Sequence, residues 1–240
     1  TTAGSGSEAT HFAVVYLGSD KYSLADACLL PDAVILDGSL ALAGSKYQKS
    51  CNVLDAMAQA IESYWAVGGT FESKLYASSA LELGWDVVFK FVGDNCTPED
   101  AQKMIEASNL AGKAINISKT TAAHAWSYAF TSEFGIPHGH AVWLTLPTIF
   151  QLHHEYSHEA SGSFYQRMNQ LTKFLKLSPE QAFDIQLKTF MSTLDIAVSP
   201  KELGLSISSR TKISKIVNMQ RMQNNPYKFK DHDISRIFSI

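Results

Sequence analysis

From residue 39 to the end of the chain, no useful stretch alternates apolar and polar residues as a half-buried strand does. Apolar residues instead recur at three- and four-residue spacing, which places them on one face of a helix. The spacing is clearest in one segment, at Val53, Leu54, Met57, Ile61 and Tyr64. The sequence therefore predicts an antiparallel helical assembly over residues 39–240, with one helix from Asn52 to Val67.

Three proline-containing stretches mark expected helix starts. Thr97-Pro98-Glu99-Asp100 combines a hydroxyl cap, a proline in the first turn and acids near the positive helix end. Ser178-Pro179-Glu180 repeats this pattern before an expected helix from Phe183 to Leu194, and Ser199-Pro200-Lys201-Glu202 repeats it again. The last two helices are expected over about Ser209 to Gln223 and Asp231 to Phe238.

The first 38 residues have a different pattern. His11 to Tyr16 predicts a strand, Gly18-Ser19-Asp20 a turn, and Ala33 to Asp37 a second, buried strand. The Gly/Ser-rich start before them is typical of a flexible linker or a cloning scar. Because two short strands make no stable sheet alone, we expect residues 1–38 to be the C-terminal remnant of a larger α/β domain. Residues 39–240 then form a separate helical domain.

Composition excludes several classes of protein. A formal net charge of -3 and a pI near 6.2 provide no overall attraction to nucleic acid or to an anionic membrane. The sequence contains no run of about 18 uncharged apolar residues and no secretory signal peptide. Cys28, Cys51 and Cys96 are dispersed and odd in number, which is typical of reduced thiols in a cytoplasmic protein.

Histidine and carboxylate side chains in helical segments suggest a metal site. His138 follows His124 by fourteen residues, and Asp55 and Gln59 lie four residues apart on one helix face. Imidazole is the commonest transition-metal ligand, and oxygen donors complete many such sites. Each of these residues alone is more often a solvated or hydrogen-bonded side chain, and neither HExxH nor paired CxxC occurs. Together the four favour a metal pocket between helices.

Four motifs, in order, carry a resemblance to a known family. They are Thr1 to Glu8, Pro31 to Asp37, Leu54 to Tyr64 and Pro137 to Ala141. The chain resembles the iron-containing (group III) alcohol dehydrogenases through nearly its whole length. The resemblance implies a Rossmann-like domain that binds NAD or NADP and an all-helical domain that holds one divalent metal, Fe²⁺ or Zn²⁺. The fold expected here is therefore mainly α, with the last strands of an α/β domain in front.

The family's glycine-rich pyrophosphate loop is not found in this sequence. Such a loop and the helix start behind it normally hold the diphosphate of a dinucleotide. We therefore expect residues 1–240 by themselves to bind NAD(H) weakly and to show no turnover.

The resemblance implies a set of metal ligands. Asp55, His124 and His138 match the family's ligands, whereas Gln59 stands where the family has another histidine. An amide oxygen is a weaker donor than imidazole toward Fe²⁺ or Zn²⁺, so we expect a reduced metal affinity and leave a metal-independent member open. Tyr128 is a second departure, since many members have a histidine there.

The resemblance also implies a reaction and a cofactor surface. Hydride passes between a nicotinamide and the carbonyl of a small aldehyde, with the metal as Lewis acid and a proton arriving through water, Tyr128 or ribose hydroxyls. Thr1, Thr2, Gly4 and Gly6 match the family loop that approaches the cofactor. Lys21 matches a lysine near the ribose, and is explained equally well as a turn lysine. A homodimer is compatible with the resemblance.

The segment Ile117 to Thr121 suggests a substrate. A lysine and three hydroxyls beside a metal suit an anion, and Asn116 to Thr121 resembles the subgroup that reduces phosphonoacetaldehyde to 2-hydroxyethylphosphonate. Alternatively, Lys119 ends the preceding helix, where a cation is favourable, and faces solvent. Two further functions stay open, an inactive helical binding module and a lyase of the dehydroquinate-synthase kind.

Overall fold

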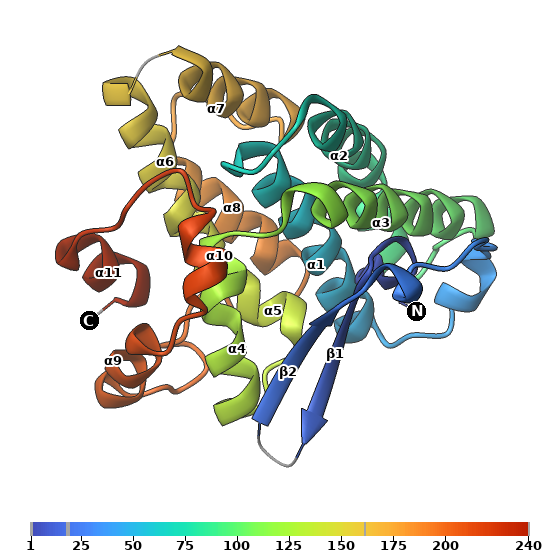
Figure 1. Cartoon of the computed structure of the whole chain (residues 1–240), viewed down its shortest axis with the longest axis horizontal. Helices are drawn as coiled ribbons and strands as arrows, with labels where there is room; N and C mark the ends of the chain where they lie inside the picture. Colours follow the sequence, from blue (N-terminus) through green and yellow to red (C-terminus); the bar gives the residue numbers. More distant parts are fainter. Residues whose placement is uncertain (1, 18–19, 161, 240) are drawn as a thin grey trace.

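Helices make up most of the computed structural model, which describes residues 2–17, 20–160 and 162–239 (Figure 1). This confirms the mainly α fold. The elements are the strands β1 (Phe12–Leu17) and β2 (Asp20–Ala25), the short 3-10 helices η1 (Ser7–Ala9), η2 (Ala27–Leu29) and η3 (Gly38–Ala41), and the helices α1 (Lys46–Trp65), α2 (Phe71–Val92), α3 (Pro98–Ser118), α4 (Ala122–Phe134), α5 (His138–Trp143), α6 (Leu146–Ala160), α7 (Gly162–Phe174), α8 (Phe183–Thr193), α9 (Ile207–Lys215), α10 (Met219–Gln223) and α11 (Asp231–Phe238).

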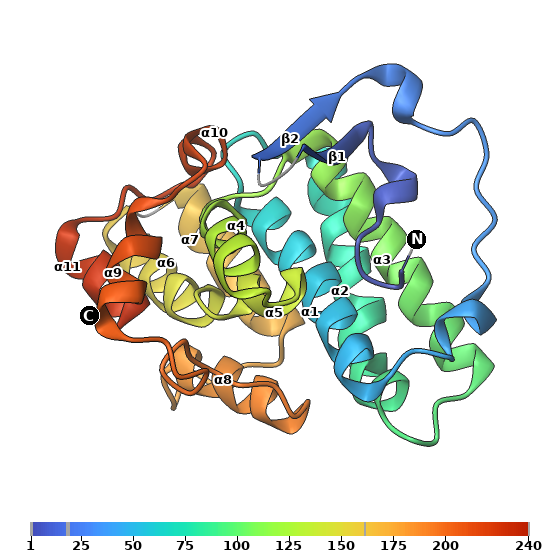
Figure 2. The ribbon, with the colours of Figure 1, turned by 90° about the horizontal axis from the view of Figure 1, so that it is seen from below.

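Helix α1 runs through the middle of the molecule. Figure 2 shows α2 and α3 on one side of it and α4 and α5 on the other. Because partners surround the helix, Val53, Leu54, Met57 and Ile61 are all fully buried, which confirms the apolar face expected from their spacing. None of the described helices is long and apolar enough to cross a membrane. The three cysteines are free thiols, as expected.

The helix start expected at Thr97 is confirmed, whereas α8 begins only at Phe183, after Ala182, which makes no side-chain cap hydrogen bond. The Thr97 hydroxyl accepts a hydrogen bond from the backbone N–H of Asp100, and the Asp100 carboxylate accepts one from the backbone N–H of Thr97. Helix α3 therefore begins with a capping box. The expected bounds of α11 match, and α8 ends one residue earlier than expected. The expected helix over about Ser209 to Gln223 is divided into α9 and α10, where Asn218 caps the second piece.

The helix start expected at Ser199 is wrong. Residues 199–204 form a turn, and Gly204 adopts the left-handed conformation with φ of 75°. A residue in the left-handed conformation ends a helix, so this turn does not continue into a second helical turn. Helix α9 begins only at Ile207, where the Ser206 side chain accepts a hydrogen bond from the backbone of Ser209.

The N-terminal strands are confirmed only in part. The strand expected over residues 11–16 is present as β1, but its partner is β2, in antiparallel register with Phe12 opposite Ala25. The expected strand from Ala33 to Asp37 is wrong, since this segment forms no ladder and the side chain of Ile35 is 94% exposed. A strand requires a neighbour for its backbone groups, and the nearby segment 20–25 supplies one for β1. Gly18 and Ser19 of the expected turn lie outside the described residues. The domain boundary after residue 38 stays a prediction.

Candidate metal centre

Asp55, His124 and His138 come together from three helices. Asp55 lies on α1, His124 on α4, and His138 is the first residue of α5. Their ligand atoms all lie within 4.8 Å of one another. The Nε2 atom of His124 is 3.5 Å from Oδ1 of Asp55, and Nε2 of His138 is 3.9 Å from the same oxygen. Two imidazoles and a carboxylate in this arrangement are a suitable donor set for a divalent transition metal.

Glu62 holds the ring of His124 in place. This side chain, fully buried on α1, accepts hydrogen bonds from Nδ1 of His124, from the hydroxyl of Thr121 at 2.8 Å and from the backbone N–H of Ala123 at 2.8 Å. Since Nδ1 carries the proton toward Glu62, the lone pair of a neutral His124 ring is on Nε2, which has no hydrogen-bond partner among the described residues. Histidines that bind a metal through one ring nitrogen commonly donate the other ring N–H to a carboxylate, as His124 does here. The residues present therefore fit a divalent ion.

The two carboxylates of the site stay ionised despite burial. Burial by itself would raise the pKa of Asp55, but the neighbouring His138 and His124 rings hold it below its ordinary value. Burial acts in the same direction on Glu62, whose pKa the charge of His124 and the hydrogen bonds from His124 and Thr121 lower. Asp55 is thus available as an anionic donor.

Gln59 lies beside the three donors, but it presents its nitrogen to them. Its Nε2 atom donates to Oδ1 of Asp55 at 3.2 Å and to the backbone oxygen of Ser5 at 3.1 Å. Its Oε1 atom is buried without a hydrogen-bond partner in the described part of the chain. The amide therefore orients Asp55 and ties it to the N-terminal loop. That Gln59 is a fourth metal ligand stays a prediction.

Gly139 explains how His138 reaches Asp55. A Cβ atom at this position would lie 1.9 Å from the backbone oxygen of Cys51 and 2.9 Å from the backbone nitrogen of Asp55. Only a glycine lets the start of α5 lie directly against α1 here. The indole N–H of Trp143 then joins the two helices by donating to the backbone oxygen of Leu54 at 2.6 Å.

Of the two residues expected to act in catalysis, Tyr128 lies beside the donor His138, and Lys119 lies at the end of α3. The ring of Tyr128 stacks on that of His138 with centroids 6.0 Å apart, and burial raises the pKa of its hydroxyl. Lys119 caps the C-terminal end of α3 and is exposed, which is the placement that the alternative interpretation of this residue predicted. The hydroxyls of Ser118 and Thr121 turn inward to Ser63 and Glu62, so they are not directed toward an external anion.

The expected cofactor loop packs on the helical domain. Thr1 lies outside the described residues, and Lys21 lies in β2 with its side chain outside them. Gly4 lies against the backbone of Asn52, and Gly6, with φ of 55°, lies against Gly112 of α3. The two glycines thus permit close helix contact, and the cofactor roles of Thr1, Thr2, Gly4, Gly6 and Lys21 stay predictions.

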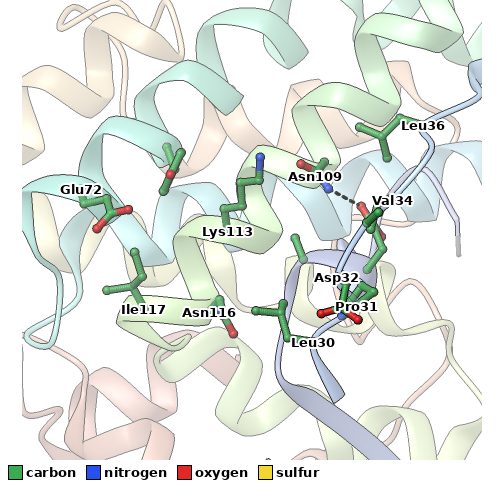
Figure 3. Close-up of a pocket in the computed structure, with 14 residues that line it drawn as sticks. Leu30, Pro31, Asp32, Val34, Leu36, Glu72, Asn109, Lys113, Asn116 and Ile117 are labelled. Atoms are coloured by element: carbon green, nitrogen blue, oxygen red, sulfur yellow. Dashed lines mark hydrogen bonds between the residues drawn. The ribbon is translucent and has the colours of Figure 1, made fainter. Parts of the chain in front are cut away.

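Two cavities flank this loop. One, of about 510 Å³, borders the metal residues and is lined by Thr2, Ser5, Tyr47, Asp55, His138 and others. The second, of about 580 Å³, shares no lining residue with the first. Figure 3 shows Asn109, Lys113, Asn116 and Ile117 on one side of it and the segment from Leu30 to Leu36 on the other. The first cavity is therefore the one positioned for chemistry at the centre.

The roles of Glu62, Gly139 and Arg221 at or near the centre were not predicted from the sequence. Glu62 lies seven residues after Asp55 and three after Gln59, so helical spacing from Asp55 was a signal that could have found it. Gly139 and Arg221 carry no such signal. Their positions depend on contacts between helices that are far apart in the sequence.

Known proteins resemble the chain over nearly its whole length. It is 26% identical over 247 aligned residues to the phosphonoacetaldehyde reductase of Streptomyces viridochromogenes, which covers 99% of this chain and 61% of the relative. Sulfoacetaldehyde reductase from Bifidobacterium kashiwanohense, solved in complex with NAD+, matches with a TM-score of 0.86 and 25% identity over 99% of this chain and 62% of the other. An iron-containing alcohol dehydrogenase from Thermotoga maritima matches with a TM-score of 0.77 and 26% identity. The match covers 100% of this chain and 62% of the other. The chain thus spans about three fifths of the length of these relatives.

Residues 51–240 match the family model for the C-terminal region of Fe-containing alcohol dehydrogenases. The match includes the three donors Asp55, His124 and His138. It also includes Glu62 behind His124. The chain belongs to the Fe-containing alcohol dehydrogenase family and contains its C-terminal region.

Proposed function

We propose that this chain is the metal-binding part of an NAD(P)-dependent aldehyde reductase that interconverts a small aldehyde and its alcohol. The observation that carries the proposal is the buried group of Asp55, His124 and His138, backed by Glu62. A divalent ion held there, Fe²⁺ or Zn²⁺, would act as a Lewis acid on a carbonyl oxygen while a bound nicotinamide exchanged hydride with the carbon.

The side chains around the centre have distinct tasks in this proposal. Glu62 keeps the proton of His124 on Nδ1, so that Nε2 faces the ion. Gln59 holds Asp55 in place from the adjacent turn of α1. Tyr128, whose hydroxyl has its pKa raised by burial, can deliver a proton toward the product oxygen beside His138.

We further propose that the aldehyde is anionic, with phosphonoacetaldehyde as the first candidate. A relative of this chain is a phosphonoacetaldehyde reductase, and a solved relative is a sulfoacetaldehyde reductase. Both names describe a two-carbon aldehyde with a tetrahedral acidic group. Lys119, exposed at the end of α3, supplies a positive charge for such a group.

A coupled experiment tests this function. A protein containing this chain is loaded with Fe²⁺ or Zn²⁺ and mixed with NADH or NADPH and phosphonoacetaldehyde. We expect cofactor oxidation in proportion to 2-hydroxyethylphosphonate formed. Catalysis without net cofactor consumption would instead favour a lyase, and the absence of both metal uptake and turnover would favour a binding module. Activity that survives complete metal removal would indicate a metal-independent reductase. The structural argument for such an enzyme is that the amide nitrogen of Gln59 donates a hydrogen bond to Asp55.

A further inference from the structure

Two cations lie outside the metal centre, Arg221 beside Tyr128 and Lys119 beside the N-terminal hairpin. The guanidinium carbon of Arg221, on α10, lies 5.4 Å from the centroid of the Tyr128 ring, which also stacks on the ring of His138. The Nζ atom of Lys119 lies 3.3 Å from Nε2 of His11 and 3.6 Å from the centroid of the Phe12 ring. The hairpin and α10 lie on the same face of the molecule, at the upper edge of Figure 2. Segments about a hundred residues apart thus bring two positive charges together.

Neither cation has a carboxylate as a salt-bridge partner in the part of the chain that the structure describes. Burial lowers the pKa of the Lys119 ammonium, and the nearby charge of Arg221 lowers it further. Two cations held close to each other without a carboxylate repel, and an anion between them relieves that repulsion.

The backbone around Lys119 is held in an unusual conformation. Its φ is 64°, which a residue with a Cβ atom rarely adopts. Asn224, next to the end of α10, donates hydrogen bonds to the backbone oxygens on both sides, those of Ser118 at 2.7 Å and Thr120 at 3.1 Å. The same contacts fix the end of α10 beside Lys119. The buried hydroxyl of Thr120 has no hydrogen-bond partner among the described residues and is a further donor.

We infer that Arg221 and Lys119 form a subsite for a tetrahedral oxyanion and that Arg221 determines specificity for anionic aldehydes. The guanidinium of Arg221 binds two oxygens of a phosphonate or sulfonate, and Lys119 binds the third. The ring of Tyr128 contacts both Arg221 and the metal donor His138, so we place the anionic end of a short aldehyde beside Arg221 and Lys119 and its carbonyl toward the centre. The inference rests on the proposed function for the identity of the reactive group, but the subsite itself needs no turnover.

Binding measurements on this chain test the subsite without cofactor or catalysis. Calorimetric titrations at pH 8 use 2-hydroxyethylphosphonate, isethionate and the neutral alcohol propan-1-ol. The variants are Arg221→Met, Lys119→Met and, as a matched control, Lys173→Met, which removes an exposed lysine from α7. We expect Arg221→Met and Lys119→Met each to weaken binding of the phosphonate by about ten- to hundredfold, the effect of one hydrogen bond to a charged group. Lys173→Met should bind as the parent does, and propan-1-ol should not distinguish the variants.

The relative affinities of the two anionic probes identify the group that the subsite prefers. A dianionic phosphonate is expected to bind more tightly than a monoanionic sulfonate, because two cations face it. The opposite order would support the subsite with a sulfonate as its ligand.

Two results would overturn the inference. One is an unchanged affinity for both anions in Arg221→Met, or in Arg221→Gln if the methionine variant does not fold. The other is a weakened affinity for NADPH with unchanged affinity for both small anions, which would assign Arg221 to a cofactor phosphate. Because the small-anion titrations involve no hydride transfer, an inactive enzyme that still binds the phosphonate would reject the proposed function and retain the subsite.

Discussion

At position 59 an amide occupies a place beside the metal donors, and its nitrogen faces Asp55. We predict that His124→Ala and His138→Ala each abolish metal retention, whereas Gln59→Ala weakens it modestly, because the amide is the poorest donor of the group. Gln59→His should tighten binding of Fe²⁺ or Zn²⁺ by about tenfold or more, equivalent to roughly 1.4 kcal/mol. Elemental analysis after dialysis measures both effects. If Gln59→His leaves the affinity unchanged, position 59 does not face the ion.

Glu62 acts on the centre only through His124. In Glu62→Gln the side chain loses its charge and one of its acceptor oxygens, so we expect metal affinity to fall by about 10- to 100-fold. The free energy of unfolding should fall by roughly 1 to 3 kcal/mol, because a buried donor loses its partner. Metal titration and thermal unfolding, with Glu82→Gln on the exposed side of α2 as control, separate the two effects. A stability loss without any change in metal affinity would limit Glu62 to a structural role.

At the scale of elements, the contact between α1 and α5 positions His138. We predict that Gly139→Ala moves α5 away from α1, since the added Cβ would lie 1.9 Å from the backbone oxygen of Cys51. The expected cost is about 1 to 3 kcal/mol of stability, together with a clear loss of metal affinity. Gly44→Ala is the matched control, because its Cβ would meet nothing closer than 3.5 Å. Equal metal affinities in the two variants would show that His138 does not depend on this contact.

At the scale of the whole molecule, a buried histidine links stability to pH. Burial lowers the pKa of His153 to about 3, among the rings of Trp65, Phe164 and Phe229. The folded chain keeps this ring neutral, whereas the unfolded chain takes up a proton below about 6.5. Its contribution is therefore fully present above pH 6.5 and is lost as the pH falls toward 3, by on the order of 5 kcal/mol.

His153→Phe removes this protonation and keeps a ring of similar shape. Between pH 6.5 and 4, the free energy of unfolding of the variant should change less than that of the parent. Denaturant unfolding at a series of pH values, with EDTA present throughout, measures the difference. Parallel curves for the two proteins would contradict the assignment of the pH dependence to His153.

Much of the architecture could be predicted because it depends on neighbours in the sequence. Apolar spacing around Met57 predicted a helix there, and the residues Thr97 to Asp100 predicted the cap of α3, since both effects act within a few residues. The types and spacing of Asp55, His124 and His138 likewise indicated a metal site. The structure brings the three together.

Other features were decided only by the tertiary structure. Segment 20–25, not segment 33–37, pairs with β1, and that choice depends on which backbone is available as a partner. Glu62 could be placed behind His124 only once α1 and α4 were in contact, and Arg221 beside Tyr128 only once α10 was in place. Residue types and local spacing thus determined the helices and the donor atoms from the sequence. Close approach of distant segments, made possible by a glycine such as Gly139, determined the geometry of the centre, because contacts between distant segments leave no local pattern in the sequence.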